Sequence, residues 1–252
     1  MLDLRRLMIA PDALCREAFP RVWPRATADG GEATQAVHVW RLSLPASDDL
    51  AFLYECLDTA ERDRAARLHR DEQRRHFAAF RGALRHILAA YLGVRPQDVP
   101  LRADKQGKPV LAPECGPPDL HFSVSHSENI ALYAVYGCGP VGIDVEVPRA
   151  RRASSLEGLI ERMLSDAEQA HLAQARSADR HNLFLGLWTL KEATAKATGA
   201  GLRTPFREMD AIAAMRHGWD LWTDPSGEVY RRAPFVLEPE SAPAALALRL
   251  AR

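Results

Sequence analysis

The chain has 252 residues, enough to bury a sizeable core in one large domain or two small ones. Hydrophobic residues make up 47% and charged residues 26%, and the formal net charge is +0, so the overall charge gives no sign of a nucleic-acid or membrane partner. No apolar run approaches the roughly 18 residues that a membrane span needs. The cysteines lack the spacing of a disulfide framework or zinc site and predict reduced thiols in a cytoplasmic protein: Cys15, Cys56, Cys115 and Cys138.

Residues 1–36 show little periodic pattern, contain several prolines, and begin with an apolar run too short for a signal peptide. We expect an extended N-terminal arm that lies over the surface. The remaining chain divides by its pattern into a first α/β half over residues 37–140 and a second over residues 141–252.

Two segments of the chain repeat the same order of elements. In the first, the alternating strand VHVWRLSL precedes a short helical segment and a long helix that ends at Gly93. In the second, VGIDVEV precedes a short helical segment and a long helix that ends at Gly199. Fifty-four positions separate Val39 from Gly93, and the same number separates Val145 from Gly199. This period predicts two similar halves, although helices that end at glycine are common enough for chance agreement to be the alternative.

Between these segments, HFSVSHS and NIALYAVY predict two strands joined by a short polar turn. DKQGKPVL, just before them, predicts a loop in which Gly107 and Pro109 bracket Lys108. Short strands are expected around Leu221, over residues 230–238 and near the carboxyl end. The predicted fold class is α+β, with two pseudo-symmetric halves, each a small, largely antiparallel sheet packed with a long helix, and the active site between them. Neither GxGxxG nor a Walker loop occurs, so nothing supports a Rossmann or P-loop fold.

Two carboxylates share one face of the strand VGIDVEV. Residues two apart on a strand point the same way, so Asp144 and Glu146 project together, and Gly142 is expected to leave open space beside them. Oxygen ligands at this spacing suit Mg²⁺. The alternative is a solvated strand face on which water screens the two charges.

The long helix of the second half supports the metal interpretation. Trp188, Glu192 and Lys196 are four positions apart and lie on one helical face, and the small residues around them would let another backbone approach. Trp188 indicates partial burial, and a partly buried Glu and Lys need partners. A metal ion for Glu192 and a phosphate for Lys196 would serve, whereas the alternative is an exposed Glu–Lys pair.

Lysine is rare in this arginine-rich chain. The lysines are Lys105, Lys108, Lys191 and Lys196. GC-rich coding would explain this, but a position that stays lysine can also need a compact ammonium, as phosphate sites do.

The segment FSVSHS places Ser125 and His126 next to each other, which on a strand turns their side chains to opposite faces. This geometry, with no G-x-S-x-G elbow, disfavours a Ser–His hydrolase. His126 alone is most simply a surface histidine. An arginine-rich run from Glu61 to Arg85 is by default a solvated helix face, with a phosphate or acidic-protein contact as the sharper option.

Four pieces of the sequence, QGKP, FSVSHS, VGIDVE and WTLKEATAKATGAGL, occur in an order that resembles the 4′-phosphopantetheinyl transferases of the larger, single-chain Sfp-like group. The resemblance covers roughly residues 37–206, and each piece alone is weak. It implies two similar α/β halves and transfer of the phosphopantetheine arm of coenzyme A to a serine of an acyl or peptidyl carrier protein, with release of adenosine 3′,5′-bisphosphate.

The resemblance also implies roles for single residues. The Mg²⁺ ligands would be Asp144, Glu146 and Glu192, with Asp144, Glu192 and Lys196 the catalytic residues. Glu192 would also take the serine proton, with Glu168 a second choice. The residues that would contact coenzyme A are Arg64, Arg81, Gly107, Lys108, Pro109, Ser125, His126 and Lys196. Two departures stand out: Ser123 where the family often has Asn, and Glu61 where a basic phosphate contact would align.

Two other functions would use the same residues. A Mg²⁺-dependent phosphodiesterase or nucleotide hydrolase would need the carboxylates but no protein acceptor. A non-catalytic scaffold that binds carrier domains or coenzyme A would not need the carboxylates and Lys196 together. Because both halves lie in one chain, we expect a monomer, with no nucleic acid or membrane as partner.

Overall fold

The structure, a computed structural model, describes residues 14–18, 24–26, 32–34, 37–44, 50–104, 107–112, 120–149, 153–201 and 204–250. Cys115 and Lys105 lie outside these residues, as does most of the predicted N-terminal arm. Internal contacts divide the chain into two compact units. The first unit comprises residues 1–17, 40–120 and 129–131, and the second comprises residues 18–39, 121–128 and 132–252. The boundaries predicted at residues 37 and 141 stay predictions.

The first unit is built around one long helix, α4 (Asp71–Leu92). Asp71 and Glu72 in its first turn favour the positive end of the helix dipole, and Gly93 ends it in the left-handed conformation at φ +68°. Its other elements are β1 (Leu14–Ala18), β4 (His38–Ser43), α2 (Ala51–Glu55), α3 (Thr59–Ala66), η1 (Pro96–Asp98), β5 (Leu101–Ala103) and β6 (Pro109–Leu111).

A buried ion-pair cluster connects α3 to α4. Asp58 caps α3 by accepting the backbone N–H of Glu61, and Glu61 in turn accepts the backbone N–H of Asp58, which forms a capping box. The guanidinium of Arg85, 1% exposed, bonds Glu61 Oε2 at 2.6 Å and Asp58 Oδ2 at 2.5 Å. It also donates to backbone carbonyls around η1, so a buried charge is fully used to hold the turn after α4.

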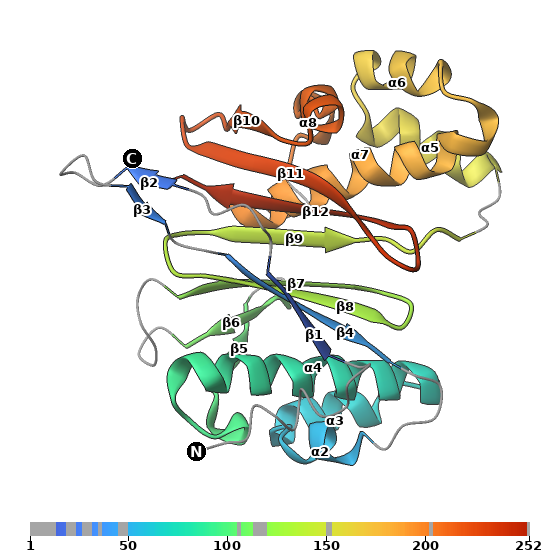
Figure 1. The fold of residues 1–252 in the computed structure, drawn as a ribbon. Helices are drawn as coiled ribbons and strands as arrows, with labels where there is room; N and C mark the ends of the chain where they lie inside the picture. The colour runs from blue at the N-terminus through green and yellow to red at the C-terminus, as the bar shows by residue number, and fades with distance from the viewer. Residues whose placement is uncertain are drawn as a thin grey trace. The chain divides into compact units, whose positions relative to one another are not determined.

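The second unit contains an antiparallel sheet in the order β10, β11, β12, β9 (Figure 1). The long helix α7 (Ser177–Thr198) packs along β9 (Val141–Val145) and β12 (Ala242–Arg249). The other elements are β2 (Pro24–Ala26), β3 (Glu32–Thr34), β7 (His121–Ser127), β8 (Ile130–Tyr136), α5 (Ala153–Met163), α6 (Asp166–Ala173), η3 (Phe206–Glu208), α8 (Ile212–His217), β10 (Asp220–Thr223) and β11 (Val229–Leu237).

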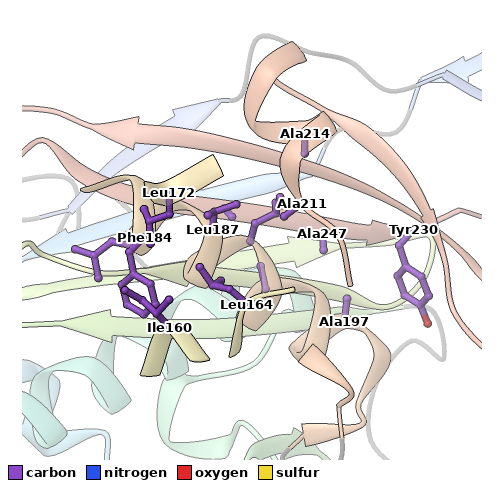
Figure 2. Packing of buried hydrophobic residues seen from close by; sticks show 14 residues of the cluster. Ile160, Leu164, Leu172, Phe184, Leu187, Ala197, Ala211, Ala214, Tyr230 and Ala247 are labelled. Carbon is purple, nitrogen blue, oxygen red and sulfur yellow. The ribbon is translucent and has the colours of Figure 1, made fainter. Parts of the chain in front are cut away.

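The core of this unit lies between α7 and its neighbours (Figure 2). Ile160, Leu164 and Leu172 from the α5–α6 region meet Phe184 and Leu187 of α7, all of them at most 3% exposed. On the sheet side the packing residues are small, chiefly alanines of β12. Small side chains let the helix lie close to the strands, which fixes where its polar face emerges.

Gly142 is the closest point of approach between β9 and α7. A Cβ atom at this position would lie 1.8 Å from the carbonyl oxygen of Ala193 and 2.7 Å from the amide nitrogen of Ala197. The expectation that Gly142 leaves open space is therefore wrong, because the backbone of α7 occupies that space. The alanines admit another backbone, as the sequence predicted.

The predicted repetition of helices is confirmed. α3 and α6 each have 8 residues, α4 and α7 each have 22, and left-handed Gly93 and Gly199 end the long pair. α6 begins with a second capping box, formed by Ser165 and Glu168. The chain is a mixed α+β protein, as the sequence predicted.

Candidate active site

Asp144 is the last residue but one of β9, which is the edge strand of its sheet. The backbone of β9 pairs with β12, with Asp144 opposite Ala245, and the amide of Glu146 extends the pairing by donating to Pro243. Asp144 is 5% exposed, whereas Glu146 is half-buried. A carboxylate as buried as Asp144 needs donors or a cation around it.

Serine hydroxyls, not backbone carbonyls, face the other edge of β9. The Oγ atoms of Ser123, Ser125 and Ser127 on β7 accept the backbone N–H groups of alternate residues of β9 and the residues after it. The three bonds are 3.2 Å to Ile143, 3.4 Å to Val145 and 3.0 Å to Val147. All three serines are buried, and His126 is exposed. We refer to Ser123, Ser125 and Ser127 as the serine column.

The two oxygens of Asp144 have different surroundings. Oδ1 accepts from Ser125 Oγ at 2.7 Å and from Lys196 Nζ at 2.8 Å. The same ammonium donates to the carbonyls of Val124, at 3.2 Å, and Ile143, at 3.0 Å. Oδ2 is buried and has no hydrogen-bond partner among the residues that the structure describes. The structure therefore holds Asp144 rigidly by one oxygen and leaves the other in need of a cation or donor.

Glu192 adds a third carboxylate from α7. Burial raises the pKa of Glu192, the charge of Asp144 raises it further, and Lys196 lowers it. Glu146 also raises this pKa. Trp188, one turn earlier, is stacked on Phe206 with ring centroids 6.2 Å apart. The predicted partial burial of this helical face is confirmed, and three carboxylates influence one another there.

The donor set suits a hard divalent cation. Carboxylate oxygens are the ligands that Mg²⁺ prefers, and the unpartnered Oδ2 of Asp144 supplies one such oxygen inside the fold. In the part of the chain that the structure describes, no group of three His, Cys, Asp or Glu side chains is already arranged around a common metal position. The residues fit Mg²⁺ by chemistry, with Lys196 neutralising Asp144 from the opposite oxygen.

Two other residues singled out in the sequence have structural roles. Glu168 is fully buried, caps α6, and pairs with Lys191 Nζ at 2.6 Å. Its Oε1 accepts the amide of Ala211 at 2.9 Å. Glu168 as an alternative proton acceptor is therefore wrong, because both oxygens are committed inside the core. Lys191 is equally buried and donates to main-chain carbonyls, so the phosphate interpretation of its ammonium is also wrong.

In the first unit, Arg64 of α3 and Arg81 of α4 both approach one aromatic ring. Their guanidinium carbons lie 5.1 Å and 5.8 Å from the ring centroid of Phe77. Arg64 is exposed, whereas Arg81 is half-buried and pairs with Glu61 at 3.3 Å. Burial lowers the pKa of Arg81. The negative charge of Glu61 raises this pKa, whereas the positive charge of Arg64 lowers it further. Glu61 thus serves as a cap and counter-ion, which explains why a basic residue is missing at that position.

Gly107 and Lys108 form the turn of the hairpin between β5 and β6. Gly107 has φ +83°, a conformation that glycine adopts without strain, and its amide donates to the Asp104 carbonyl at 3.0 Å. The amide of Lys108 donates to Asp104 Oδ1 at 2.9 Å. Pro109 begins β6, so the predicted loop is shorter than expected.

Comparison with known proteins decides the family. A model of the 4′-phosphopantetheinyl transferase superfamily matches residues 140–230, and a model of the N-terminal part of 4′-phosphopantetheinyl transferases matches residues 40–136. The 4′-phosphopantetheinyl transferase HetI of Nostoc sp. is 40% identical over 167 residues, which are 66% of this chain and 70% of that protein. The chain belongs to the 4′-phosphopantetheinyl transferase superfamily. It is therefore a transferase.

More distant relatives of the transferase carry the same name. The 4′-phosphopantetheinyl transferase Sfp of Bacillus subtilis is 28% identical over 134 residues, or 53% of this chain and 55% of that protein. The 4′-phosphopantetheinyl transferase pptA of Paxillus involutus is 28% identical over 193 residues, or 69% of this chain and 72% of that protein. The described helices of the transferase include none with the length and apolar character to cross a membrane.

Proposed function

We propose that the transferase moves the 4′-phosphopantetheine group of coenzyme A to a serine hydroxyl of an acyl or peptidyl carrier protein, with Mg²⁺, and releases adenosine 3′,5′-bisphosphate. Family membership supports the group transferred and coenzyme A as its donor. The observation that carries the metal-dependent part is the buried, unpartnered Oδ2 of Asp144. It lies where Glu146 and Glu192 add to the negative charge.

Asp144, Glu146 and Glu192 would hold the metal ion. When bound, Mg²⁺ stabilises the negative charge that builds on the pyrophosphate as its P–O bond breaks. Lys196 neutralises the charge of Asp144 and fixes the orientation of its carboxylate through the contact with Oδ1. The carrier serine forms the new O–P bond, and its proton passes to a carboxylate. Glu192 is our choice for that acceptor, because its carboxylate makes no hydrogen bond within the described residues and is only partly buried on α7.

The coenzyme A contacts come from residues of different character. Arg64 and Arg81, held on the Phe77 ring, present two guanidinium groups that suit a phosphate. Lys108 follows a glycine turn whose backbone allows close approach of a nucleotide. His126 is exposed on β7, where a phosphate could reach its ring. The Ser125 hydroxyl bonds Asp144 and the Val145 amide, so its contribution is to the carboxylate as much as to coenzyme A.

Carrier choice and cellular setting follow from the same proposal. Carrier proteins present an acidic helix beside the serine, as the resemblance implies, and the arginines of the first unit supply opposite charge. We propose a monomer acting in the cytoplasm, because coenzyme A and apo-carrier proteins meet there.

The test is incubation of the transferase with coenzyme A, Mg²⁺ and a panel of apo-carrier domains, read by intact mass. The expected result is a mass gain of one phosphopantetheine on at least one carrier, dependent on Mg²⁺ and on the carrier serine. A panel without any mass gain would refute the proposal. Release of adenosine 3′,5′-bisphosphate without a carrier would instead indicate a hydrolase.

A further inference from the structure

One hydroxyl of the serine column contacts both a neighbouring backbone and a carboxylate of the proposed metal site. Ser127 Oγ accepts the amide of Val147 at 3.0 Å and donates to Glu146 Oε2 at 3.1 Å. Ser127 is 8% exposed, so its hydroxyl is largely screened from water. A hydroxyl has a single proton to donate, and the bond from the Val147 amide fixes the orientation in which that proton reaches Glu146.

We propose that Ser127 is a positioning residue that fixes the Glu146 carboxylate for metal binding. The inference rests on the proposed function, in which Glu146 is a metal ligand. Glu146 follows the last residue of β9, and its amide bonds Pro243 at 3.0 Å, so its backbone is already fixed by β12. The side chain still has three rotatable bonds and is only half-buried. A fixed hydroxyl donor therefore selects among the orientations that remain.

The serine column contains its own control. Ser123 makes the same kind of bond to β9, accepting the amide of Ile143 at 3.2 Å. On the carboxylate row of β9, however, the residue beside Ile143 is Gly142, whose space the backbone of α7 fills. Ser123 thus holds the strand without orienting a carboxylate. Ser125 is unsuited as a comparison, because Asp144 Oδ1 is also held by Lys196.

The experiment compares Ser127→Ala, Ser123→Ala and Ser127→Thr with the wild type. Mn²⁺, which takes the same oxygen ligands as Mg²⁺, is titrated by electron paramagnetic resonance with coenzyme A present and no carrier protein. Melting in metal-free buffer reports the cost of losing one bond to β9. Transfer to an apo-carrier is then measured across Mg²⁺ concentrations, to separate metal affinity from turnover at saturating metal.

We expect Ser127→Ala to weaken Mn²⁺ binding about tenfold or more, because loss of a residue that orients a ligand typically weakens metal affinity by about 10–100-fold. The Mg²⁺ concentration for half-maximal transfer should rise in parallel, with turnover at saturating Mg²⁺ largely kept. Ser123→Ala should bind Mn²⁺ like the wild type despite a comparable loss of melting temperature. Ser127→Thr keeps the donor and should restore binding.

Several results would overturn the inference while leaving the proposed function intact. Wild-type Mn²⁺ affinity in Ser127→Ala would do so, and equal weakening in Ser127→Ala and Ser123→Ala would assign the effect to the strand and not to Glu146. An unfolded Ser127→Ala beside a folded Ser123→Ala would make the role of Ser127 purely structural. A wild-type protein that binds no Mn²⁺ would contradict the proposed function itself.

Discussion

The two long helices of the transferase show how one architecture serves two purposes. Counting from their terminal glycines, Gly93 and Gly199, positions in the first unit correspond to positions 106 residues later. On this alignment buried Arg85 corresponds to buried Lys191, and each cation pairs with the glutamate of a capping box at 2.6 Å. Both units therefore tie a short helix to a long one by the same device, with a different cation.

The same alignment shows a chemical difference between the two units in the residues that correspond to the candidate active site. On this alignment the positions of Asp144, Glu146, Glu192 and Lys196 correspond to His38, Trp40, His86 and Ala90, of which the last three lie in the first unit. None of these four corresponding residues is a carboxylate or a lysine, whereas a buried ion pair is present in both units. The comparison indicates that the ion pair belongs to the fold, whereas the carboxylates and Lys196 are specific to the second half of the repeat, where the proposed function uses them.

The largest expected effect is on activity. Asp144→Asn keeps the shape of the side chain but removes the charge that Lys196 neutralises and the metal would bind. Transfer should fall by about 10²-fold or more, the typical loss for an electrostatic group in an active site, while circular dichroism stays native. The matched variant His38→Gln, at the position 106 residues earlier that corresponds to Asp144, should keep transfer. Comparable losses in both variants would contradict the chemical separation of the units.

Removal of the buried cations should affect stability in both units. Lys191→Met leaves buried Glu168 without its cation, which costs about 3–5 kcal/mol. Arg85→Met should cost less, because Glu61 keeps its ion pair with Arg81. Adding Glu168→Gln to Lys191→Met should recover much of this loss, because glutamine removes the charge and preserves the capping box. Urea denaturation measures the free energy of unfolding of the single and double variants. A double variant no more stable than Lys191→Met would mean that the packing of the lysine, and not the charge, matters.

A glycine allows close backbone contact with another element in each unit, at Gly82 of α4 and at Gly142 of β9, but only Gly142 lies on the strand that carries Asp144. Gly142→Ala would force β9 from α7, since the added Cβ would fall 1.8 Å from the Ala193 carbonyl oxygen. Gly82→Ala would do the same between α4 and α2, at 2.2 Å from the Leu53 carbonyl oxygen. Each should cost about 1–3 kcal/mol or more by overpacking. Only Gly142→Ala should raise the Mg²⁺ requirement of transfer at temperatures where the fold persists, because only β9 carries Asp144.

The smallest expected effects are opposite pH dependences at corresponding positions. Burial raises the pKa of Glu192, so its ionised form destabilises the fold at neutral pH, and this penalty disappears as pH falls through the raised pKa. Glu192→Gln should therefore raise the metal-free melting temperature near neutral pH but not in acid.

Burial lowers the pKa of His86 below its ordinary value of 6.5, so the fold loses stability as pH falls through 6.5 and the unfolded chain takes up the proton first. His86→Gln should flatten that loss. Melting curves recorded across a range of pH would test both variants. If Glu192 and His86 changed the melting temperature in the same direction as pH falls, the predicted opposite pH dependences would be refuted.

Local patterns in the sequence were enough for the long helices, for the strands of the FSVSHS and VGIDVEV segments, and for the partial burial of Glu192 and Lys196. Period-two and period-3.6 patterns are set by which side chains face the core, so β9, α7 and the glycine at the end of each long helix were predicted. The pairing of Asp144 with Lys196 was not, because it depends on how closely α7 lies on Gly142.

Other roles were missed although a signal was present. Ser165 and Glu168 have the spacing of a capping box, which would have assigned Glu168 to the fold before any catalytic role. Serines at every second position of a strand share one face, but their use as acceptors for the amides of β9 requires knowing which strands are neighbours. The rarity of lysine was misleading at Lys191. Its buried ion pair with Glu168 explains why a cation is present at this position without a phosphate.

The serine column has a consequence for solubility. β9 is the edge strand of its sheet, and bare amides on such an edge invite another chain to add a strand and begin aggregation. Hydroxyl oxygens occupy three alternate amides there without offering a peptide ladder that could continue outward. The transferase can thus keep the strand that carries Asp144 at the edge of a sheet while that edge stays closed to self-association.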